Sequence, residues 1–273
     1  MGGSWGLALK ARGVAVRRIG CDKPDVLERA LAAGAIDKGV SDIAAAVRDA
    51  DLIILATPVG SILNILSQLK SVVSPRALIT DVGSTKRLIC QRAREIFGEE
   101  PLFLGGHPLA GKERSGLEHA SAALFEGTRY VLTPLLPNHL DDMRVRAFSQ
   151  LVEAVGAKPF IAEASTHDRA VAFFSHLPQL VSSGLASMIA EQGAEDFLPL
   201  DLAASGFRDV TRLAESPYNV WRDICLTNIE NIQSALDALI EKLEAMKLHL
   251  SDRELERDFL KALKLREKLR EVK

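Results

Sequence analysis

The stretch LIILATPVGSILNILSQL, residues 52–69, indicates how the first half of the chain folds. Its opening run of four apolar residues is typical of a strand that is buried on both faces of a parallel sheet. After the break at Pro58, the apolar residues continue in a segment long enough to form a helix. A strand followed by a helix is the repeating unit of an α/β domain, and this stretch therefore predicts one.

The same alternation runs through the rest of the first half. Short apolar runs follow one another along the chain, and helix-like segments separate them. Regular alternation of this kind predicts a Rossmann-like, doubly wound α/β sheet. We expect strands at 14–20, 52–57, 77–81, 102–105 and 130–133, and helices at 4–12, 24–33, 41–49, 60–69 and 85–97.

The strand signal ends near Phe160, and long helical patterns follow it to the end of the chain. Pro178 lies inside one of these patterns and predicts a kink there. The change of period indicates two domains. We expect an α/β domain over residues 1–162 and an all-α domain over residues 163–273.

Composition limits the classes of partner. The 273 residues include 34 Lys plus Arg and 36 Asp plus Glu, so a formal net charge of −2 gives no basic excess for nucleic acid or an anionic membrane. No apolar run approaches the length of a membrane-spanning helix, and no signal peptide is recognisable. Three widely spaced cysteines form neither a disulfide framework nor a CxxC motif, which favours a reducing cytoplasm.

The N-terminal residues carry part of a dinucleotide-binding pattern. Gly2-Gly3-Ser4 begins a helix-like segment, and Asp22 follows Gly2 by 20 positions. In such folds the helix start faces the pyrophosphate, and an acidic residue about 20 positions on binds the ribose hydroxyls. A free carboxylate at Asp22 would favour NAD and repel the 2′-phosphate of NADP, although Asp22 could also cap the helix that begins at Pro24.

Three further loops would meet at the carboxyl edge of the predicted sheet. Thr57-Pro58-Val59 follows one strand and lies where a nucleotide binds in such sheets, unless it is an ordinary strand-to-helix turn. Ser84 and His107 lie in glycine-containing loops after the next two strands, where a backbone can approach a ligand closely. Either side chain could instead be structural, Ser84 as a helix cap and His107 as a buried imidazole.

Three polar clusters lie in the helical half, at 167–168, 175–179 and 206–212. Metal binding explains them poorly, because His167 and His176 are nine positions apart and no HExxH pair is present, so we expect no metal. Structural explanations remain open for His167-Asp168 as residues of a first helical turn, and for Arg208-Asp209 as a surface pair.

Taken in order, these motifs resemble the prephenate/arogenate (cyclohexadienyl) dehydrogenase family. The resemblance spans residues 2 to about 231 and rests on GGS at 2–4, Asp22, ATPV at 56–59, DVGSTK at 81–86, GGHPLAG at 105–111, His167-Asp168, SHLP at 175–178, GFRDVTR at 206–212 and WRDI at 221–224.

The resemblance implies a nucleotide-binding domain followed by a helical domain that forms a homodimer, with the active site between them. It implies that His107 is the catalytic group, that Ser84 hydrogen-bonds beside it, and that Arg212 binds a substrate carboxylate. It further places Glu113 at the mouth of the pocket, His176 and Gln179 at the substrate, and Asp209 and Trp221 near the site of the partner subunit. Many family members carry His at the position of Gln179, so the choice between prephenate and arogenate stays open.

The implied reaction is NAD-dependent oxidative decarboxylation of prephenate to 4-hydroxyphenylpyruvate, or of arogenate to tyrosine, in tyrosine biosynthesis. A neutral imidazole could accept the ring hydroxyl proton, and a guanidinium could hold a carboxylate with two hydrogen bonds. One departure from the family is the absence of the first strand and of the first two glycines of the phosphate loop. Two alternatives therefore remain: a 6-phosphogluconate-type dehydrogenase of a small hydroxy or imino acid, and an inactive nucleotide-binding dimer.

Overall fold

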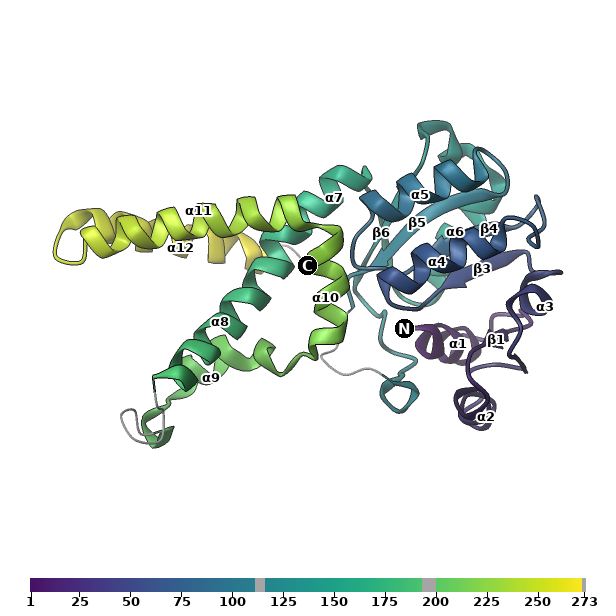
Figure 1. Cartoon of the computed structure of the whole chain (residues 1–273), viewed down its shortest axis with the longest axis horizontal. Coiled ribbons are helices and arrows are strands. Elements are labelled where there is room, and N and C mark those ends of the chain that lie inside the picture. The colour runs from purple at the N-terminus through teal and green to yellow at the C-terminus, as the bar shows by residue number, and fades with distance from the viewer. Residues whose placement is uncertain (111–115, 193–199, 272–273) are drawn as a thin grey trace.

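The computed structural model describes residues 1–110, 116–192 and 200–271, and it consists of an α/β half followed by a helical half (Figure 1). Within these ranges the strands of the α/β half form two sheets. The smaller sheet pairs β1 (Ile19–Cys21) with β2 (Lys38–Val40). The larger sheet has the order β3 (Leu52–Leu55), β4 (Leu78–Asp81), β5 (Leu102–Pro108), β6 (Arg129–Pro134) and β7 (Lys158–Ile161).

Helices cover both faces of the larger sheet, as the near-continuous apolar character of its strands predicts. One face packs against α4 (Val59–Leu69) and α5 (Arg87–Phe97), and the other against α1 (Gly2–Ala11) and α6 (Met143–Ala154). On the second face Trp5 of α1 is buried against the rings of Phe125, Tyr130 and Phe148, with ring centroids 5.3–5.8 Å apart. The side chain of Trp5 thus fixes α1 to the larger sheet.

Strand pairing departs from the expected parallel sheet at one place. Four of the five neighbouring pairs in the two sheets are parallel, but β6 runs antiparallel to β5, with His107 opposite Val131. The described part of the β5–β6 connection holds one short 3-10 helix, η1 (Leu117–His119), and no α-helix. A parallel return requires a long crossover, usually through a helix, so this connection brings β6 back in the opposite direction.

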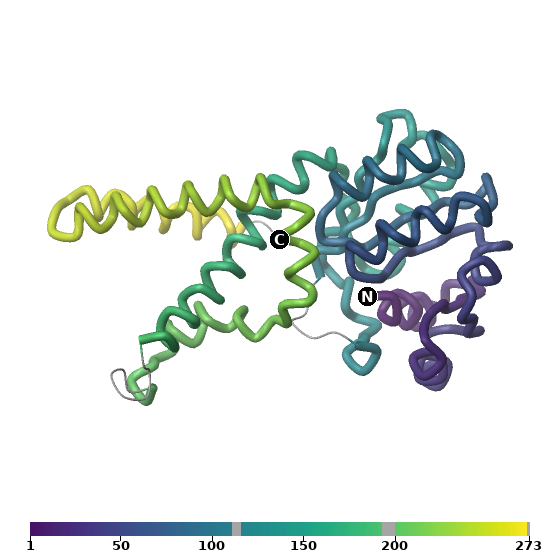
Figure 2. The backbone as a smooth tube through the Cα atoms, viewed as in Figure 1, coloured from purple at the N-terminus to yellow at the C-terminus, as the bar shows by residue number. Residues whose placement is uncertain are grey.

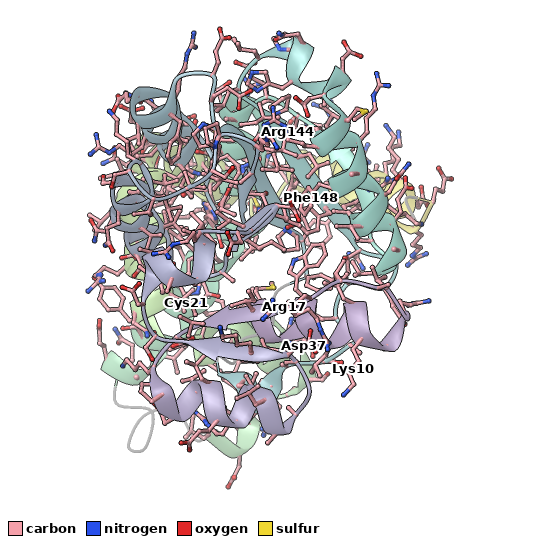
Figure 3. The ribbon with its side chains drawn as sticks, turned by 90° about the vertical axis from the view of Figure 1, so that its right-hand side faces the viewer. Lys10, Arg17, Cys21, Asp37, Arg144 and Phe148 are labelled. Carbon is pink, nitrogen blue, oxygen red and sulfur yellow. The ribbon has the colours of Figure 1, made fainter. Side chains whose placement is uncertain are left out.

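The two sheets are separate units, and the described strands form no ladder between β1 and β3. Figure 3 shows the smaller sheet with α1 and α2 (Pro24–Ala32) as a layer beside the larger one. The break lies where a first, central strand would stand in a doubly wound sheet. Close packing within the smaller unit depends on Gly6, because a Cβ there would stand 1.9 Å from the carbonyl oxygen of Ala35. Arg18 strengthens this packing by donating to the carbonyl of Gly6 at 2.9 Å.

The remaining described helices of the α/β half are α3 (Ile43–Val47) and the 3-10 helix η2 (Pro137–Asp141). The helical half begins with α7 (Ala164–Val171), which passes through a π-helical turn, η3 (Ala172–His176), into α8 (Leu177–Glu191). The turn ends directly before Leu177-Pro178, where the kink is expected. The other helical elements are η4 (Leu200–Leu202), α9 (Ser205–Thr211), η5 (Arg212–Glu215), α10 (Tyr218–Thr227), α11 (Ile229–Leu248) and α12 (Arg253–Glu271).

The helical half forms two arms that extend away from the α/β half. Figures 1 and 2 show α8 with α9 as one arm and the antiparallel pair α11 and α12 as the other, with α10 next to α4. Among the described residues of this half, Ala172, Ile224 and Ile232 form a small buried apolar cluster. No described helix is long and apolar enough to cross a membrane. Large apolar side chains are exposed along both arms, among them Met188, Leu202, Ile240, Leu243, Phe259 and Leu263.

Candidate active site

Asp81 organises the two glycine-containing loops at the carboxyl edge of the larger sheet. It is the last residue of β4 and is fully buried. Its Oδ1 accepts from the backbone N–H of Gly106 at 3.1 Å, and its Oδ2 accepts from that of Gly83 at 2.8 Å. The same Oδ2 forms an ion pair with Lys86, which is also fully buried. One carboxylate therefore fixes the backbone next to Ser84 and next to His107.

Gly106 makes this approach possible. A Cβ at Gly106 would stand 2.4 Å from the carbonyl oxygen of Asp81, closer than atoms of neighbouring strands can come. The glycine lets β5 lie against the end of β4, and the following residue, His107, is then held at the sheet edge. The glycines before His107 thus serve close packing of the strand ends.

His107 is half-buried and contacts a second histidine from the helical half. Its Nδ1 lies 2.8 Å from Nε2 of His167, and the two rings meet edge to face with centroids 5.0 Å apart. Burial is the main cause that lowers the pKa of His107 well below its usual value, and interactions with His167, Lys86 and His176 act in the same direction. At neutral pH the imidazole of His107 is therefore uncharged and can accept a proton.

Asp168 joins the two halves of the molecule. Its fully buried carboxylate accepts from the backbone N–H groups of Lys86 at 2.7 Å and Arg87 at 2.9 Å, at the N-terminus of α5. It also binds Nδ1 of His167 at 2.8 Å. The positive end of the helix dipole and the unpaired N–H groups of a first helical turn both favour a carboxylate here.

His176 lies on the other side of Asp168 and is linked to it through Asn228. The Nδ2 of Asn228 donates to the carbonyl oxygen of Asp168 at 2.8 Å and lies 3.3 Å from Nδ1 of His176. The His176 ring also meets Trp221 edge to face, with centroids 5.8 Å apart. Burial lowers the pKa of His176 to about 4, so this side chain is neutral at pH 7. The structure thus connects His107, His167, Asp168, Asn228, His176 and Trp221.

Gln179 is buried and holds the segment that carries Arg212. Its Nε2 donates to the carbonyl oxygen of Leu213 at 2.8 Å and to Oγ of Ser183 at 3.2 Å. Both hydrogens of the amide are therefore directed at protein acceptors, and only Oε1 remains for another ligand. Arg212 is exposed and is the first residue of η5. Because Gln179 belongs to α8, its hydrogen bond to Leu213 fixes the backbone next to Arg212.

The other residues expected at the substrate are Ser84, Asp209 and Glu113. Ser84 is half-buried, and no hydrogen bond joins it to His107 among the described residues. Asp209 is exposed on α9, and no described contact links it to the His107 cluster. Glu113 lies outside the described residues. Within the described ranges, no three His, Cys, Asp or Glu side chains gather so that they could hold a metal ion.

The residues expected to bind the nucleotide lie at the start of α1 and at the ends of β1 and β3. A Cβ at Gly2 would stand 3.2 Å from Cβ of Ala56, and one at Gly3 would stand 2.5 Å from the side chain of Leu117. The start of α1 therefore packs closely against the end of β3. Ser4 is buried and accepts from the backbone N–H of Ser121 at 3.1 Å, so its hydroxyl already serves the fold.

Asp22 and the loop after β3 complete this side of the candidate site. Asp22 is exposed at the end of β1, and its Oδ1 accepts from the N–H of Lys23 at 2.8 Å. Lys23, not Asp22, is the N-cap residue of α2, so the carboxylate of Asp22 is available to a ligand. Thr57 and Pro58 are exposed, whereas the side chain of Val59 is buried in the core. The small residues at the N-terminus of α1, the exposed carboxylate of Asp22 and the loop after β3 are features that suit a dinucleotide.

Sequence reasoning missed the roles of Asp81, Lys86 and Asn228. Asp81 and Lys86 flank the Val-Gly-Ser loop within one motif, and a charged pair at a buried strand end is a recognisable signal. Asn228 carries no comparable signal, because its partners His176 and Asp168 are more than 50 positions away.

Comparison with known proteins assigns both halves to one family. The profile described as "Prephenate dehydrogenase, nucleotide-binding domain" matches residues 5–161, and that described as "Prephenate dehydrogenase, dimerization domain" matches residues 163–265. The chain belongs to the prephenate dehydrogenase family. The resemblance found in the sequence is thereby confirmed, and so is the fold class of a Rossmann-like domain followed by a helical dimerisation domain.

Individual members of the family are similar over nearly the whole chain. Prephenate dehydrogenase of Bacillus subtilis (strain 168) is 34% identical over 265 residues, which are 95% of this chain and 70% of that protein. The crystal structure of prephenate dehydrogenase from A. aeolicus in complex with hydroxyphenyl propionate and NAD+ has a TM-score of 0.87 at 30% identity, covering 99% of this chain and 94% of that one. Synechocystis arogenate dehydrogenase has a TM-score of 0.81 at 29% identity, covering 98% and 95%.

Proposed function

We propose that this chain oxidises and decarboxylates prephenate to 4-hydroxyphenylpyruvate, or arogenate to tyrosine, with NAD, in tyrosine biosynthesis. It is an oxidoreductase of the prephenate dehydrogenase family. The observation that carries the proposal is the neutral imidazole of His107, held at the carboxyl edge of the sheet by Asp81, Gly106 and His167. Ligands of open α/β sheets bind at that edge.

His107 would act as the general base. When bound, NAD supplies the acceptor for the hydride that leaves the ring carbinol carbon. That hydride leaves readily only if the ring hydroxyl loses its proton as the carbonyl forms, and a neutral imidazole can accept this proton. Because the pKa of His107 is lowered by burial, the imidazole is available in its neutral form throughout the physiological range.

Decarboxylation follows without a second acid. Once the ring carbonyl exists, the bond to the ring carboxylate breaks, carbon dioxide leaves, and the electron pair passes through the ring to the carbonyl oxygen. The ring becomes aromatic, which drives the step. The phenolic oxygen takes up a proton, and protonated His107 lies where it can return the one that it accepted.

Arg212 would bind a carboxylate of the substrate. A guanidinium can hold a carboxylate with two parallel hydrogen bonds, which orients the substrate as well as binding it. Gln179 supports this role by fixing the carbonyl of Leu213, the next residue. Ser84, Glu113, His176 and Gln179 complete the proposed substrate set, and Asp209 and Trp221 are proposed to lie near the site of a second copy.

NAD is proposed in preference to NADP. The exposed carboxylate of Asp22 can accept hydrogen bonds from ribose hydroxyls, and it would repel a 2′-phosphate. Gly2, Gly3 and Ser4 at the start of α1, with Thr57, Pro58 and the backbone of Val59, would face the phosphates. The first helical turn offers N–H groups and the positive end of a helix dipole to these anions.

A homodimer through the helical half is also part of the proposal. Its arms expose many large apolar side chains, whereas the buried apolar cluster among the described residues of this half is small. Exposed apolar surface of this extent is typical of a protein interface. The proposed boundary between the two domains is residue 162, between the end of β7 and the start of α7. We place the enzyme in the cytoplasm, where its three free thiols would stay reduced.

A direct assay tests the function. The purified chain is incubated with prephenate or arogenate and with NAD or NADP, and reduced nucleotide is followed by its absorbance. We expect reduction of NAD with at least one of the two substrates. Activity with a small hydroxy acid and none with prephenate or arogenate would favour another dehydrogenase class. Failure to bind NAD by calorimetry would support an inactive dimer.

A further inference from the structure

His167 of α7 connects His107, the proposed base, to the buried carboxylate of the next residue, Asp168. His167 bridges Nδ1 of His107 and Oδ1 of Asp168, with both nitrogen contacts at 2.8 Å. We propose that His167 and Asp168 are positioning residues, which fix the tautomer of His107 so that its Nε2 is the atom that accepts the substrate proton. The inference rests on the proposed function, because it assigns an atom and a supporting chain to the same base.

The carboxylate of Asp168 is surrounded by hydrogen-bond donors. The N–H groups of Lys86 and Arg87 supply two hydrogen bonds at the N-terminus of α5. Both favour the ionised carboxylate, because a helix N-terminus stabilises negative charge. An ionised carboxylate only accepts hydrogen bonds. Nδ1 of His167 must therefore carry the hydrogen in its contact with Asp168.

The hydrogen on Nδ1 determines the rest of the His167 ring. A neutral imidazole has one N–H group and one acceptor nitrogen. If the ring of His167 is neutral and Nδ1 is the donor to Asp168, Nε2 is the acceptor. The atom facing this acceptor is Nδ1 of His107, so Nδ1 of His107 must be the donor. If the hydrogen of His107 were on Nε2 instead, two lone pairs would face each other across 2.8 Å.

The consequence is an open acceptor on His107. With its hydrogen on Nδ1, the ring presents the lone pair of Nε2, and no hydrogen bond to Nε2 is found among the described residues. Free neutral histidine favours the tautomer with its hydrogen on Nε2. The hydrogen bonds from Asp168 through His167 to His107 would reverse that preference. The same hydrogen bonds would stabilise the imidazolium that forms when His107 accepts the substrate proton, since Asp168 lies behind it.

Three variants distinguish a positioning role of His167 and Asp168 from a role in folding alone. His167→Leu removes the acceptor, whereas His167→Gln can present an amide oxygen near the position of Nε2. Asp168→Asn can turn an N–H group toward His167, which reverses both tautomers. The matched control is His249→Leu, because His249 also binds an aspartate, Asp252, at 2.7 Å but lies on the surface near the end of α11.

The first readout is the tautomer itself. Nitrogen NMR of the protein with ¹⁵N-labelled histidine distinguishes N–H from acceptor nitrogens, and His107→Asn identifies the signals of His107. We expect the hydrogen on Nδ1 of His107 in the unaltered chain and in His249→Leu, and a shift toward Nε2 in Asp168→Asn. A hydrogen on Nε2 of His107 in the unaltered chain would overturn the proposal, whatever the substrate proves to be.

The second readout is the division between kcat and KM. We expect His167→Leu to lower kcat by about 10²–10³-fold with KM nearly unchanged, the range that a misoriented general base costs. His167→Gln should recover at least part of kcat, and His249→Leu should match the unaltered chain. Full turnover in His167→Leu would reject the role of His167. Absence of dehydrogenase activity in the unaltered chain would reject the proposed function instead, and the NMR result would still decide the tautomer.

Discussion

The carboxylate of Asp223 on α10 accepts a hydrogen bond from the backbone N–H of Gly60 at 2.9 Å. Gly60 belongs to the first turn of α4, directly after the proposed nucleotide loop, and Asp223 belongs to the helical half. A carboxylate at a helix N-terminus satisfies an N–H group that has no partner in the helix and interacts with the helix dipole. This bond therefore joins the two halves close to the candidate site.

Replacement of this carboxylate should weaken the junction. We expect Asp223→Ala to lower the free energy of unfolding by about 1–2 kcal/mol, because it leaves a partly buried N–H unpaired. Denaturant unfolding measures the loss. Asp237→Ala on the exposed face of α11 is the control and should change stability by less than about 0.5 kcal/mol. Equal effects of the two substitutions would show that the hydrogen bond between Asp223 and Gly60 adds nothing to the free energy of unfolding.

The base itself is tested by His107→Asn. We expect kcat to fall by roughly 10²–10⁴-fold, the usual contribution of a positioned general base, while the affinity for NAD changes little. Steady-state kinetics and calorimetry with NAD measure the two quantities. His119→Asn replaces a histidine of the η1 turn and serves as the control. Turnover at the unaltered rate in His107→Asn would remove His107 from the mechanism.

Arg212 should contribute mainly to substrate binding. We expect Arg212→Ala to raise KM for the substrate by about 10–100-fold, since a charge-assisted pair with a carboxylate is lost. Arg146→Ala is the matched control, because Arg146 is an exposed arginine of α6 that pairs with Asp141. An unchanged KM in Arg212→Ala would count against the carboxylate contact.

The preference for NAD should depend on Asp22. We expect Asp22→Ala to lower kcat/KM with NAD and to narrow the difference between NAD and NADP, because the ribose acceptor and the repulsion of a 2′-phosphate are both removed. Asp25→Ala changes a neighbouring exposed carboxylate, which pairs with Arg29, and should leave the ratio unchanged. A higher kcat/KM with NADP than with NAD in the unaltered chain would contradict the assignment.

His176 should make stability depend on pH. Its pKa of about 4 in the folded chain lies below the value of about 6.5 for an unfolded imidazole, so the unfolded chain binds the proton first as pH falls. The stabilising contribution is present above about pH 6.5 and is lost toward about pH 4, by up to about 3 kcal/mol. His107 contributes with the same sign, because its pKa is also lowered.

Denaturant unfolding at several pH values measures this loss. His176→Gln should flatten the dependence between about pH 6.5 and about pH 4, since a group that does not titrate cannot contribute to it. His249→Gln should not flatten it, because the pKa of His249 is raised by Asp252. An identical dependence in the unaltered chain and in His176→Gln would show that His176 does not carry the effect.

Four of the five strands of the larger sheet could be predicted from the sequence because they are apolar runs. The runs at 52–57, 77–81, 102–105 and 130–133 correspond to β3, β4, β5 and β6. The sequence did not reveal β2 and β7, which each lie at one end of a sheet. Only Lys38 of β2 is exposed and its other two residues are half-buried, whereas β7 is largely exposed. Edge strands need no continuous apolar run, since one side of each strand faces solvent.

The candidate site could be predicted only in part. His107 is conspicuous because Gly-Gly and Pro flank it at a strand end. Its contact with His167 joins residues 60 positions apart and arises from the packing of α7 against the α/β half, which no local pattern specifies. Gln179 stays a proposed substrate residue, but the sequence could not show that both of its amide hydrogens bind acceptors within the protein.

The exposed apolar side chains of the two arms have a thermodynamic consequence. Few apolar side chains are buried among the described residues of the helical half, so this half gains little from folding alone, because burial is the main favourable contribution to stability. With the pairing proposed above, folding of this half and association of two copies become a single equilibrium. The stability of the enzyme then follows the law of mass action and rises with the concentration of the chain.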